Sequence, residues 1–537
     1  TVSNNNFTGG TGEAAKNESG SAITADGNTW GDFAINPGYP TVYNIFVSTG
    51  VYTGGTDSNP VGELSASAST VSVNTPVTAD GADVATVTIT AKGNNNDNLL
   101  AGISAAKISF AVSGTNNATT SPSATNGSGI STSTITSTKA ETKTIIVVID
   151  GVQLTSQPQV VFNPGPLDHI MFTAEPATGG TAGTNFAVQP VVTLYDVNNN
   201  VLTTDGASQV TLSAVLASDG TTPGAGMLNA TANPVTVTAG VATFAGVNYT
   251  GVDNIKLKAL SGVTALTGAI QNNPAAASYL TVTAASGTPT AGQNNELTIR
   301  AYDAYGNLVN MGANNYTGSK TLTFSGPAVI GSYTPTVEGV NVGTSASVTF
   351  TNGETSGTNA TLVAYKAETV SVDVTDDTIS SSGNDAYDAD LTVSPAAIAS
   401  LDIGAAPNPL TTAQTSTVTV TGTDTYGNTI TSDNTTNVSF LYSGDGLTLT
   451  PAVGGTLSSG VLTATLTKTS AGSVTVTASA TGLTQDSVTV TFTDGTAPQV
   501  STTDPVLGST NRSIATIPTL TFSEDMATTT LNGTNIK

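Results

Sequence analysis

The sequence predicts an all-β protein made of tandem β-sandwich domains that follow one another in an extended row. Apolar residues alternate with Thr and Ser along many short segments, a turn pattern recurs along the chain, and only 9% of the 537 residues are charged. Alternation gives each strand one apolar face, and Thr or Ser suits the face that meets water. A disordered chain of low charge would lack this repeated apolar face.

The recurring pattern is a strand that runs into a turn rich in Asp and Asn. Clear copies lie at residues 194–201, 301–308 and 422–429, and a looser copy lies at 91–99. Asn and Gly accept positive φ, and an Asp side chain can bind backbone amides across the turn. Each copy therefore predicts a strand–turn–strand element with a fixed register. The copies stand about 100 to 120 residues apart, which is the length of one immunoglobulin-like (Ig-like) sandwich.

A second pattern closes each repeat with two strands joined by a short polar connection. The predicted pairs are 131–136 with 144–148, 240–244 with 255–259, 346–350 with 360–365, and 460–466 with 472–478. Their period of two is that of strands, and no stretch shows the 3.6-residue period of a helix.

Segments rich in Pro and Ala mark the predicted domain boundaries, because Pro cannot donate a hydrogen bond to a sheet. These joints are residues 163–166, 273–277, 394–397 and 494–498. The predicted parts are an N-terminal partial β domain at 1–62, Ig-like domains 1 to 4 at 63–163, 164–277, 278–395 and 396–494, and the incomplete start of a further Ig-like domain at 495–537. Linkers this short bring adjacent domains into contact and favour a stiff rod.

Several segments resemble known bacterial domain families. Residues 63–73 and 78–89 resemble the opening of invasin/intimin-type bacterial Ig-like (Big) repeats, and 164–395 look like related repeats of large bacterial surface proteins. Residues 496–500, 504–508 and 520–526 resemble the start of another bacterial Ig-like family, which is found in surface and S-layer proteins. The resemblance covers about residues 63–537 and implies an extracellular protein of the prokaryotic cell surface.

The two ends of the chain leave two interpretations open. Residues 1–62 contain Trp30 and a predicted strand at 41–47, and together with the C-terminal segment they approach the length of one domain. Either the C-terminal segment is cut within a longer protein, or the tail of one subunit completes the head of the next by donating a strand.

Composition excludes several classes of partner and chemistry. The formal net charge is −24, from 37 acidic and 13 basic residues, so nucleic acid and anionic lipid are disfavoured as partners. The chain has no Cys, which excludes disulfides, thiolate zinc sites and cysteine nucleophiles. We expect no transmembrane segment, because no apolar run approaches 18 residues. No signal peptide is visible, and the polar start at Thr1 indicates a processed chain.

We expect no enzyme, no catalytic residue and no cofactor-binding residue. The single histidine, His169, lies in a predicted strand at a domain joint, where a Ser/His/Asp triad would need a cleft. No Gly-rich loop leads from a strand into a helix, as a phosphate site requires. Paired carboxylates for glycoside hydrolysis would need a deep pocket, which Ig-like sandwiches of low charge rarely supply.

Calcium is the predicted cofactor, at an acidic cluster in domain 3. The cluster consists of Asp373, Asp376, Asp377, Asp385, Asp388 and Asp390. So many like charges repel unless a cation lies among them, and Ca²⁺ prefers oxygen ligands. The alternative is a solvated acidic loop. The turn residues Asp196, Asp303 and Asp424 form a second group, for which turn capping is the main interpretation and calcium the other.

The sequence therefore predicts a structural protein of the prokaryotic cell surface. The first hypothesis is a self-assembling subunit of a surface layer (S-layer) or fibre, whose partner is a further copy of itself. The alternative is an adhesin stalk that projects a distal ligand-binding domain toward glycans or a host surface. An enzyme with Ig-like accessory modules would need a catalytic domain that this sequence does not show.

Overall fold

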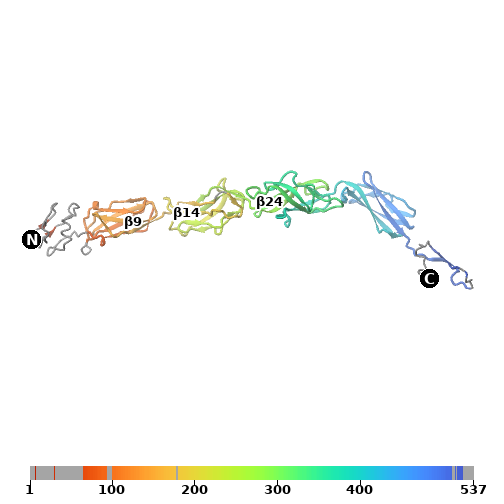
Figure 1. The fold of residues 1–537 in the computed structure, drawn as a ribbon, viewed down its shortest axis with the longest axis horizontal. Helices are drawn as coiled ribbons and strands as arrows, with labels where there is room; N and C mark the ends of the chain where they lie inside the picture. The colour runs from red at the N-terminus through yellow and green to blue at the C-terminus, as the bar shows by residue number, and fades with distance from the viewer. Residues whose placement is uncertain are drawn as a thin grey trace. The chain divides into compact units, whose positions relative to one another are not determined.

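A computed structural model confirms the all-β prediction (Figure 1). It describes residues 6–7, 29–30, 64–93, 99–176, 179–510, 515 and 517–523. In this part of the chain the one helical element is a 3-10 turn, η1 (Ala105–Lys107), and no helix has the length and hydrophobicity of a membrane span. The chain forms two compact units, Thr1–Pro274 and Ala275–Lys537.

Domain 1 of the first unit is a sandwich of two sheets. Its strands are β3 (Thr70–Val73), β4 (Val77–Thr78), β5 (Ala85–Thr90), β6 (Ile108–Val112), β7 (Asn117–Thr119), β8 (Ile130–Ser137), β9 (Thr142–Ile149), β10 (Val152–Gln153) and β11 (Gln159–Asn163). One sheet has the order β3-β5-β8-β7, and the other has the order β10-β9-β11-β4 with β6 beside β9. The alternating residues of β8 and β9 point into the core between the two sheets, as the period of two predicts.

Domain 2 of the first unit repeats this architecture. Its strands are β12 (His169–Ala174), β13 (Gly180–Thr181), β14 (Val191–Tyr195), β15 (Gln209–Leu216), β16 (Leu228–Asn229), β17 (Val235–Thr236), β18 (Val241–Thr243), β19 (Asn248–Tyr249), β20 (Asn254–Ser261), β21 (Val263–Leu266) and β22 (Ile270–Asn273). The sheet β12-β14-β18 faces the sheet β13-β22-β20-β15-β17, and β21 pairs with β20. The short strands β16 and β19 form a separate antiparallel pair.

Domain 3, in the second unit, forms one continuous hydrogen-bonded network. Its strands are β23 (Ala277–Ala284), β24 (Asn294–Asp303), β25 (Gly318–Ser325), β26 (Thr336–Val337), β27 (Val340–Asn341), β28 (Ser345–Thr351), β29 (Glu354–Thr355), β30 (Thr361–Val363), β31 (Thr369–Thr375) and β32 (Ala389–Thr392). The order is β27-β26-β30-β24-β29-β28-β25-β31-β32, with β23 beside β24. Because β23 begins at Ala277, domain 3 begins before residue 278.

Domain 4, also in the second unit, returns to two separate sheets. Its strands are β33 (Ile398–Ala406), β34 (Leu410–Thr411), β35 (Thr415–Asp424), β36 (Asn437–Tyr442), β37 (Leu447–Thr450), β38 (Gly455–Thr456), β39 (Val461–Lys468), β40 (Gly472–Ser479) and β41 (Asp486–Thr493). The sheets have the orders β33-β35-β39-β37 and β34-β41-β40-β36-β38. After this domain, β42 (Val500–Asp504) and β43 (Thr519–Phe522) pair as an antiparallel hairpin.

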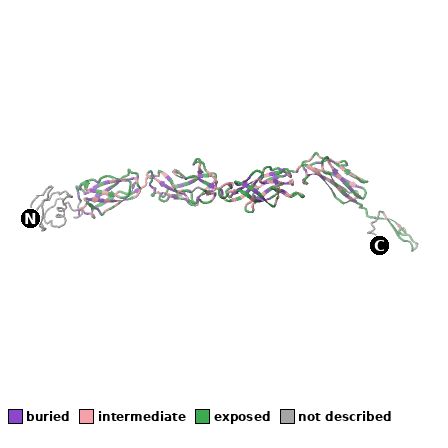
Figure 2. Ribbon diagram, turned by 45° about the horizontal axis from the view of Figure 1, so that its top comes forward, coloured by how far each residue is buried: buried purple, intermediate pink, exposed green. Residues whose placement is uncertain are grey.

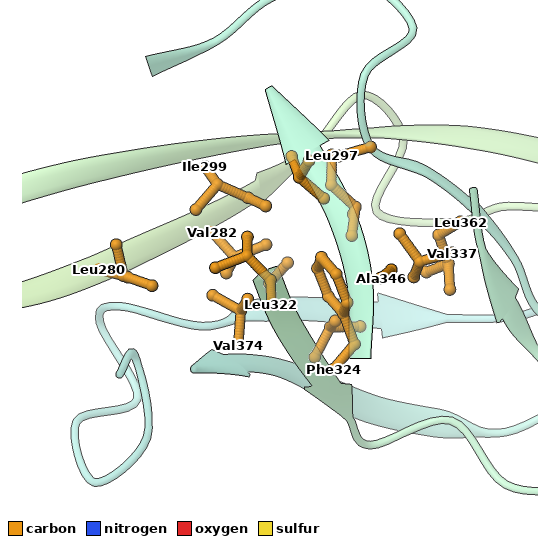
Figure 3. Close-up of a cluster of buried hydrophobic side chains, with 14 of the residues drawn as sticks. Leu280, Val282, Leu297, Ile299, Leu322, Phe324, Val337, Ala346, Leu362 and Val374 are labelled. Carbon is orange, nitrogen blue, oxygen red and sulfur yellow. The ribbon is translucent and has the colours of Figure 1, made fainter. Parts of the chain in front are cut away.

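Each of the four domains encloses its own buried core, shown in purple in Figure 2. Figure 3 shows the core of domain 3, where apolar side chains such as Leu280, Val282 and Phe324 gather between the strands. Burying such a side chain is worth about 1.5–3 kcal/mol. A chain without disulfides therefore rests on these cores.

The predicted turns are confirmed, but the strand expected after each turn is reduced to one bridged residue. The turn copies at 194–201, 301–308 and 422–429 are each closed by a single antiparallel bridge, such as Tyr195 to Val201. The paired strands are also present, but in domains 1, 2 and 4 they lie in opposite sheets, so that in domain 1 the loop between β8 and β9 crosses the sandwich.

Two expectations fall outside the described residues. The predicted strand at 41–47 is one of them, and most of the looser turn copy at 91–99 is the other. Of the segment 1–62 the structure describes β1 (Asn6–Phe7) and β2 (Thr29–Trp30), which pair in parallel.

Candidate functional site at the joints between domains

The recurring turn places one buried aspartate next to the linker that precedes its domain. Asp303 and Asp424 are the last residues of β24 and β35, and Asp196 directly follows β14. Their relative exposures are 0%, 1% and 1%. A buried carboxylate is stable only when it is hydrogen-bonded, so its partners show what the turn does.

In domain 2 the Asp196 carboxylate accepts four hydrogen bonds. Its Oδ1 atom accepts the backbone N–H groups of Asn198 at 2.9 Å and Asn200 at 2.8 Å. Its Oδ2 atom accepts the N–H group of Gly165 at 2.8 Å and the side-chain amide of Asn200 at 2.9 Å. Gly165 belongs to the predicted Pro-rich linker, so the carboxylate ties the linker to the turn.

The other two turns use the same contacts. Asp303 Oδ2 accepts the linker N–H group of Ala275 at 3.0 Å, and Asp424 Oδ2 accepts that of Ala396 at 2.9 Å. Each Oδ1 atom accepts the N–H groups two and four residues further on, at 2.9 Å throughout. The Asn at the fourth position, Asn307 or Asn428, donates its side-chain amide to the carboxylate.

Hydrogen bonding outweighs burial in setting the pKa values of Asp196 and Asp424. Burial by itself raises the pKa of Asp196, but bonds from Asn200, Gly165 and Asn198 hold that pKa below its ordinary value. The pKa of Asp424 is lowered in the same way, against the effect of burial, by Asn428, Ala396 and Tyr426. Hydrogen bonds thus favour the ionised form of both Asp196 and Asp424.

These contacts decide between the two interpretations of the turn aspartates. Both oxygens of each carboxylate receive N–H donors, whose protons occupy the positions that a cation would need. The geometry is that of turn capping, which was the main interpretation.

The asparagine of the turn also reaches the preceding domain. In the first unit, Asn200 donates from Nδ2 to the carbonyl of Thr138 at 2.9 Å, and its Oδ1 accepts the N–H group of Ala140 at 2.8 Å. In the second unit, Asn428 donates to the carbonyl of Tyr365 at 2.7 Å and accepts from Ala367 at 2.6 Å. One carboxamide thus bridges two domains, and we call the Asp and Asn together the clasp.

The clasp binds a loop between two consecutive strands of the preceding domain, β8 and β9 in domain 1 and β30 and β31 in domain 3. We call residues 138–141 of domain 1 and 365–368 of domain 3 the receiving loops. Both loops contain Lys-Ala-Glu followed by Thr, so that residues 139–142 and 366–369 are both Lys-Ala-Glu-Thr. This repeat is a signal that the sequence-based reasoning did not use.

The glutamate of each receiving loop pins the loop to its own domain. Glu141 Oε1 accepts the N–H group of Thr115 at 2.9 Å, and Glu368 Oε1 accepts that of Ala328 at 2.7 Å. Glu141 also contacts Lys143 at 2.6 Å, and Glu368 contacts Lys366 at 2.8 Å. The contacts that fix the loop therefore lie within its own domain and do not involve the asparagine.

The aspartates predicted to bind calcium have several different partners. Asp376 accepts the Tyr316 hydroxyl at 2.7 Å and the N–H group of Ile379 at 2.9 Å. Asp390 accepts the hydroxyl of Ser371. Asp377 has a left-handed backbone with φ 71°, and its N–H group donates to Thr375.

The remaining three aspartates lie closer together. Burial, followed by the charges of Asp373 and Asp385, raises the pKa of Asp388, against a hydrogen bond from Ser381. One buried oxygen of Asp388 has no hydrogen-bond partner. Among the described residues, however, no three acidic or histidine side chains are placed to hold a metal ion. Calcium at this loop stays a prediction.

His169 lies in β12 beside Asp168, whose carboxylate is 2.9 Å from its Nδ1 atom. Its ring stacks on Tyr195 with centroids 5.3 Å apart and an interplanar angle of 12°. These contacts hold the ring against the neighbouring strand β14, and His169 lies in a strand as the sequence predicts.

Comparison with known families identifies the class of domain. Residues 65–165 match the family model "Invasin, domain 3", and residues 494–537 match the model "Bacterial Ig-like domain". The resemblances drawn from the sequence are thereby confirmed for domain 1 and for the C-terminal segment. Domain 1 is thus similar to an invasin domain, and the C-terminal segment is similar to a bacterial Ig-like domain.

Among solved structures, the chain is similar to the Escherichia coli adhesin FdeC (16% identity, 81% of this chain and 100% of that chain, TM-score 0.21). It is also similar to InvD of Yersinia pseudotuberculosis (19% identity, 58% and 95%, TM-score 0.33). Invasin, described as a bacterial integrin-binding protein, is a third (14% identity, 81% and 82%, TM-score 0.27). Structural similarity at these TM-scores does not indicate a function. No curated protein matches the chain.

Proposed function

We propose that the chain is a stiff spacer of a prokaryotic cell-surface protein, a stalk that holds a ligand-binding region away from the cell. The observation that carries the proposal is the clasp. In the joint between domains 1 and 2 and in that between domains 3 and 4, a buried Asp binds the linker and an Asn binds the preceding domain. Such a joint restricts rotation between consecutive domains.

The family matches support the surface location. Domain 1 matches a domain of invasin, and the C-terminal segment matches a domain type found in bacteria. The partner of the stalk would be a host surface or a glycan, bound by a region other than the joints. In this function the repeats span distance and carry no catalytic group.

Stiffness at the joints can be measured directly in the full chain. The chain lacks Cys, so spin labels attach only where Cys is introduced. Ser347→Cys with Thr465→Cys would report on domains 3 and 4, and Thr132→Cys with Thr211→Cys would report on domains 1 and 2. These four side chains are exposed. We expect a narrow distance distribution for each pair.

Breaking one clasp should loosen only its own joint. Asn428→Ala removes the two hydrogen bonds that cross the joint, worth about 1 kcal/mol each, and also the bond to Asp424 inside domain 4, so the distribution between domains 3 and 4 should broaden. Asn200→Ala should do the same between domains 1 and 2. Asn229→Ala is the matched control and should change neither distribution, because this exposed side chain donates to Asn248 within domain 2. Broad distributions in the unaltered chain would rule out the stiff spacer.

A second candidate, the self-assembling subunit of an S-layer or fibre, is favoured by one face of domain 4. The outward side of β37, β39 and β35 is a grid of threonines without a charged side chain. The grid consists of Thr415, Thr417, Thr419, Thr448, Thr450, Thr463, Thr465 and Thr467. Because copies with a net charge of −24 repel, they would meet through uncharged faces of this kind.

A further inference from the structure

The residue two positions after the clasp aspartate also contacts the preceding domain, and it differs between joints. In domain 2 this residue is Asn198, whose Nδ2 donates to the carbonyl of Ala79 in domain 1 at 3.0 Å. In domain 4 it is Tyr426, which packs against the buried apolar cluster of domain 3. We call this position the plug.

The Tyr426 ring fits an aromatic socket. Its centroid is 5.0 Å from that of Tyr333 in an edge-to-face arrangement at 88°, and 5.1 Å from that of Tyr365 at 59°. Tyr333 and Tyr365 also contact each other, with centroids 5.5 Å apart. Edge-to-face and tilted contacts of this kind are the favourable arrangements of aromatic rings.

Gly292 forms the floor of the socket. A Cβ atom at this position would overlap the hydroxyl and ring atoms of Tyr426. The φ of Gly292 is +77°, which also favours glycine, and its N–H group donates to Ala364 at 2.8 Å. The absence of a side chain at residue 292 therefore leaves the space that the tyrosine fills.

The clasp gives no specificity for one domain over another, because its asparagine binds only backbone atoms of the receiving loop. The plug does contact features that differ, a carbonyl in one joint and aromatic rings in the other. We infer that the plug is the specificity-determining residue of each joint, so that the socket of Gly292, Tyr333 and Tyr365 selects a turn bearing an aromatic plug. The inference rests on the proposed spacer function and deepens it.

The test uses the full chain with the label pair Ser347→Cys and Thr465→Cys. Tyr426→Asn places the plug of the other joint in the aromatic socket. The fraction of molecules whose label distance lies outside the narrow peak should rise about threefold to tenfold. Tyr426→Phe keeps the ring and should leave the distribution narrow. The label pair between domains 1 and 2 should not respond to either change.

A second variant acts from the opposite side of the joint. Tyr333→Ala alters an exposed side chain of domain 3 and leaves domain 4 unchanged, so it should broaden the same distribution as Tyr426→Asn. Circular dichroism and urea unfolding should show that both variants fold.

The outcomes separate this inference from the spacer function. A broad distribution in the unaltered chain contradicts the spacer. The plug alone is contradicted if the unaltered chain is narrow and Asn428→Ala broadens it, while Tyr426→Asn and Tyr333→Ala leave it narrow. Equal broadening by Tyr426→Phe and Tyr426→Asn also overturns the inference, because it shows that the ring is not what the socket recognises.

Discussion

At the scale of single residues, two kinds of aspartate occur in this chain. Asp196 and Asp424 are surrounded by N–H donors, which lower the pKa of each carboxyl despite burial. Asp388 is partly buried near Asp373 and Asp385, and these surroundings raise its pKa. The first kind contributes stability that is present above the unfolded pKa and is lost as pH falls through the folded pKa. The second kind contributes stability that is present below the unfolded pKa and is lost as pH rises through the folded pKa.

We predict that Asp388→Asn stabilises domain 3 at neutral pH. A raised folded pKa means that the native state favours the protonated carboxyl, so this contribution is full below the unfolded pKa and is lost as pH rises through the folded pKa. Asn mimics the protonated form at every pH. The gain should be small, on the order of 0.5 kcal/mol, and larger at pH 7 than at pH 3. Urea unfolding at both pH values measures it.

The same variant tests the calcium prediction. If Ca²⁺ joins the carboxylates of Asp373 and Asp388, calcium should raise the melting temperature of the unaltered chain, and Asp388→Asn should abolish that rise. Asp402→Asn, in an exposed position of β33, is the matched control. An unchanged melting temperature in excess calcium would leave proton sharing as the explanation of the raised pKa and would refute the metal site.

At the scale of elements, the receiving loops explain how one asparagine side chain finds two backbone groups in the correct places. The loop crosses from one sheet to the other in domain 1, and its glutamate binds a neighbouring loop. Domain 3 uses the same glutamate in the same position. Preorganisation of this kind reduces the entropy that the joint must lose when it closes.

We predict that Glu368→Ala weakens both domain 3 and the joint that follows it. The substitution leaves the N–H group of Ala328 without its acceptor and should cost about 1–2 kcal/mol in the free energy of unfolding. Lys366→Ala is the matched control, because it removes only a partly exposed ion pair and should cost less than about 0.5 kcal/mol. Equal losses in the two variants, measured by urea unfolding, would show that the ion pair and not the pinned loop matters.

The strands and turns could be predicted from the sequence because both are local. Alternation in 460–466 predicts β39, and the spacing of Asp424 and Asn428 predicts a capped turn. The receiving loop could not be predicted, because Asn428 binds backbone atoms about 60 residues away, and a backbone group has no side-chain signature. The single network of domain 3 was missed for a related reason, since the two-residue strand β29 joins its halves and is too short to show a period.

The candidate site was predicted only in part. The aspartates of the turns were recognised as capping residues, but their link to the Pro-rich linkers appears only when the fold brings Gly165 to Asp196 and Ala396 to Asp424. The plug at Tyr426 has no signal in a single sequence, because nothing in the turn pattern requires an aromatic residue there. Its meaning comes from Gly292 in another domain.

At the scale of the whole molecule, charge opposes contact between copies. A net charge of −24 repels identical chains at low ionic strength, and salt screens this repulsion within about 10 Å at 0.1 M. No acidic side chain lies within the threonine grid of domain 4, where β35, β37 and β39 present hydroxyl and methyl groups, and Asp402 lies beside it on the adjoining strand β33. The stalk and the assembling subunit therefore differ in what the chain does once its charges are screened.

We predict that the stalk stays monomeric when salt is raised, whereas an assembling subunit associates through the grid. Light scattering of the full chain at high protein concentration, in about 0.02 M and about 0.5 M salt, distinguishes the two. Thr417→Lys and Thr465→Glu each place a charge at the centre of the grid, at exposed positions where they leave the core intact. Association that appears with salt and disappears in both variants would establish the assembling subunit. A monomer under all conditions would leave the stalk, because screened copies with an open uncharged face would then have no attraction for one another.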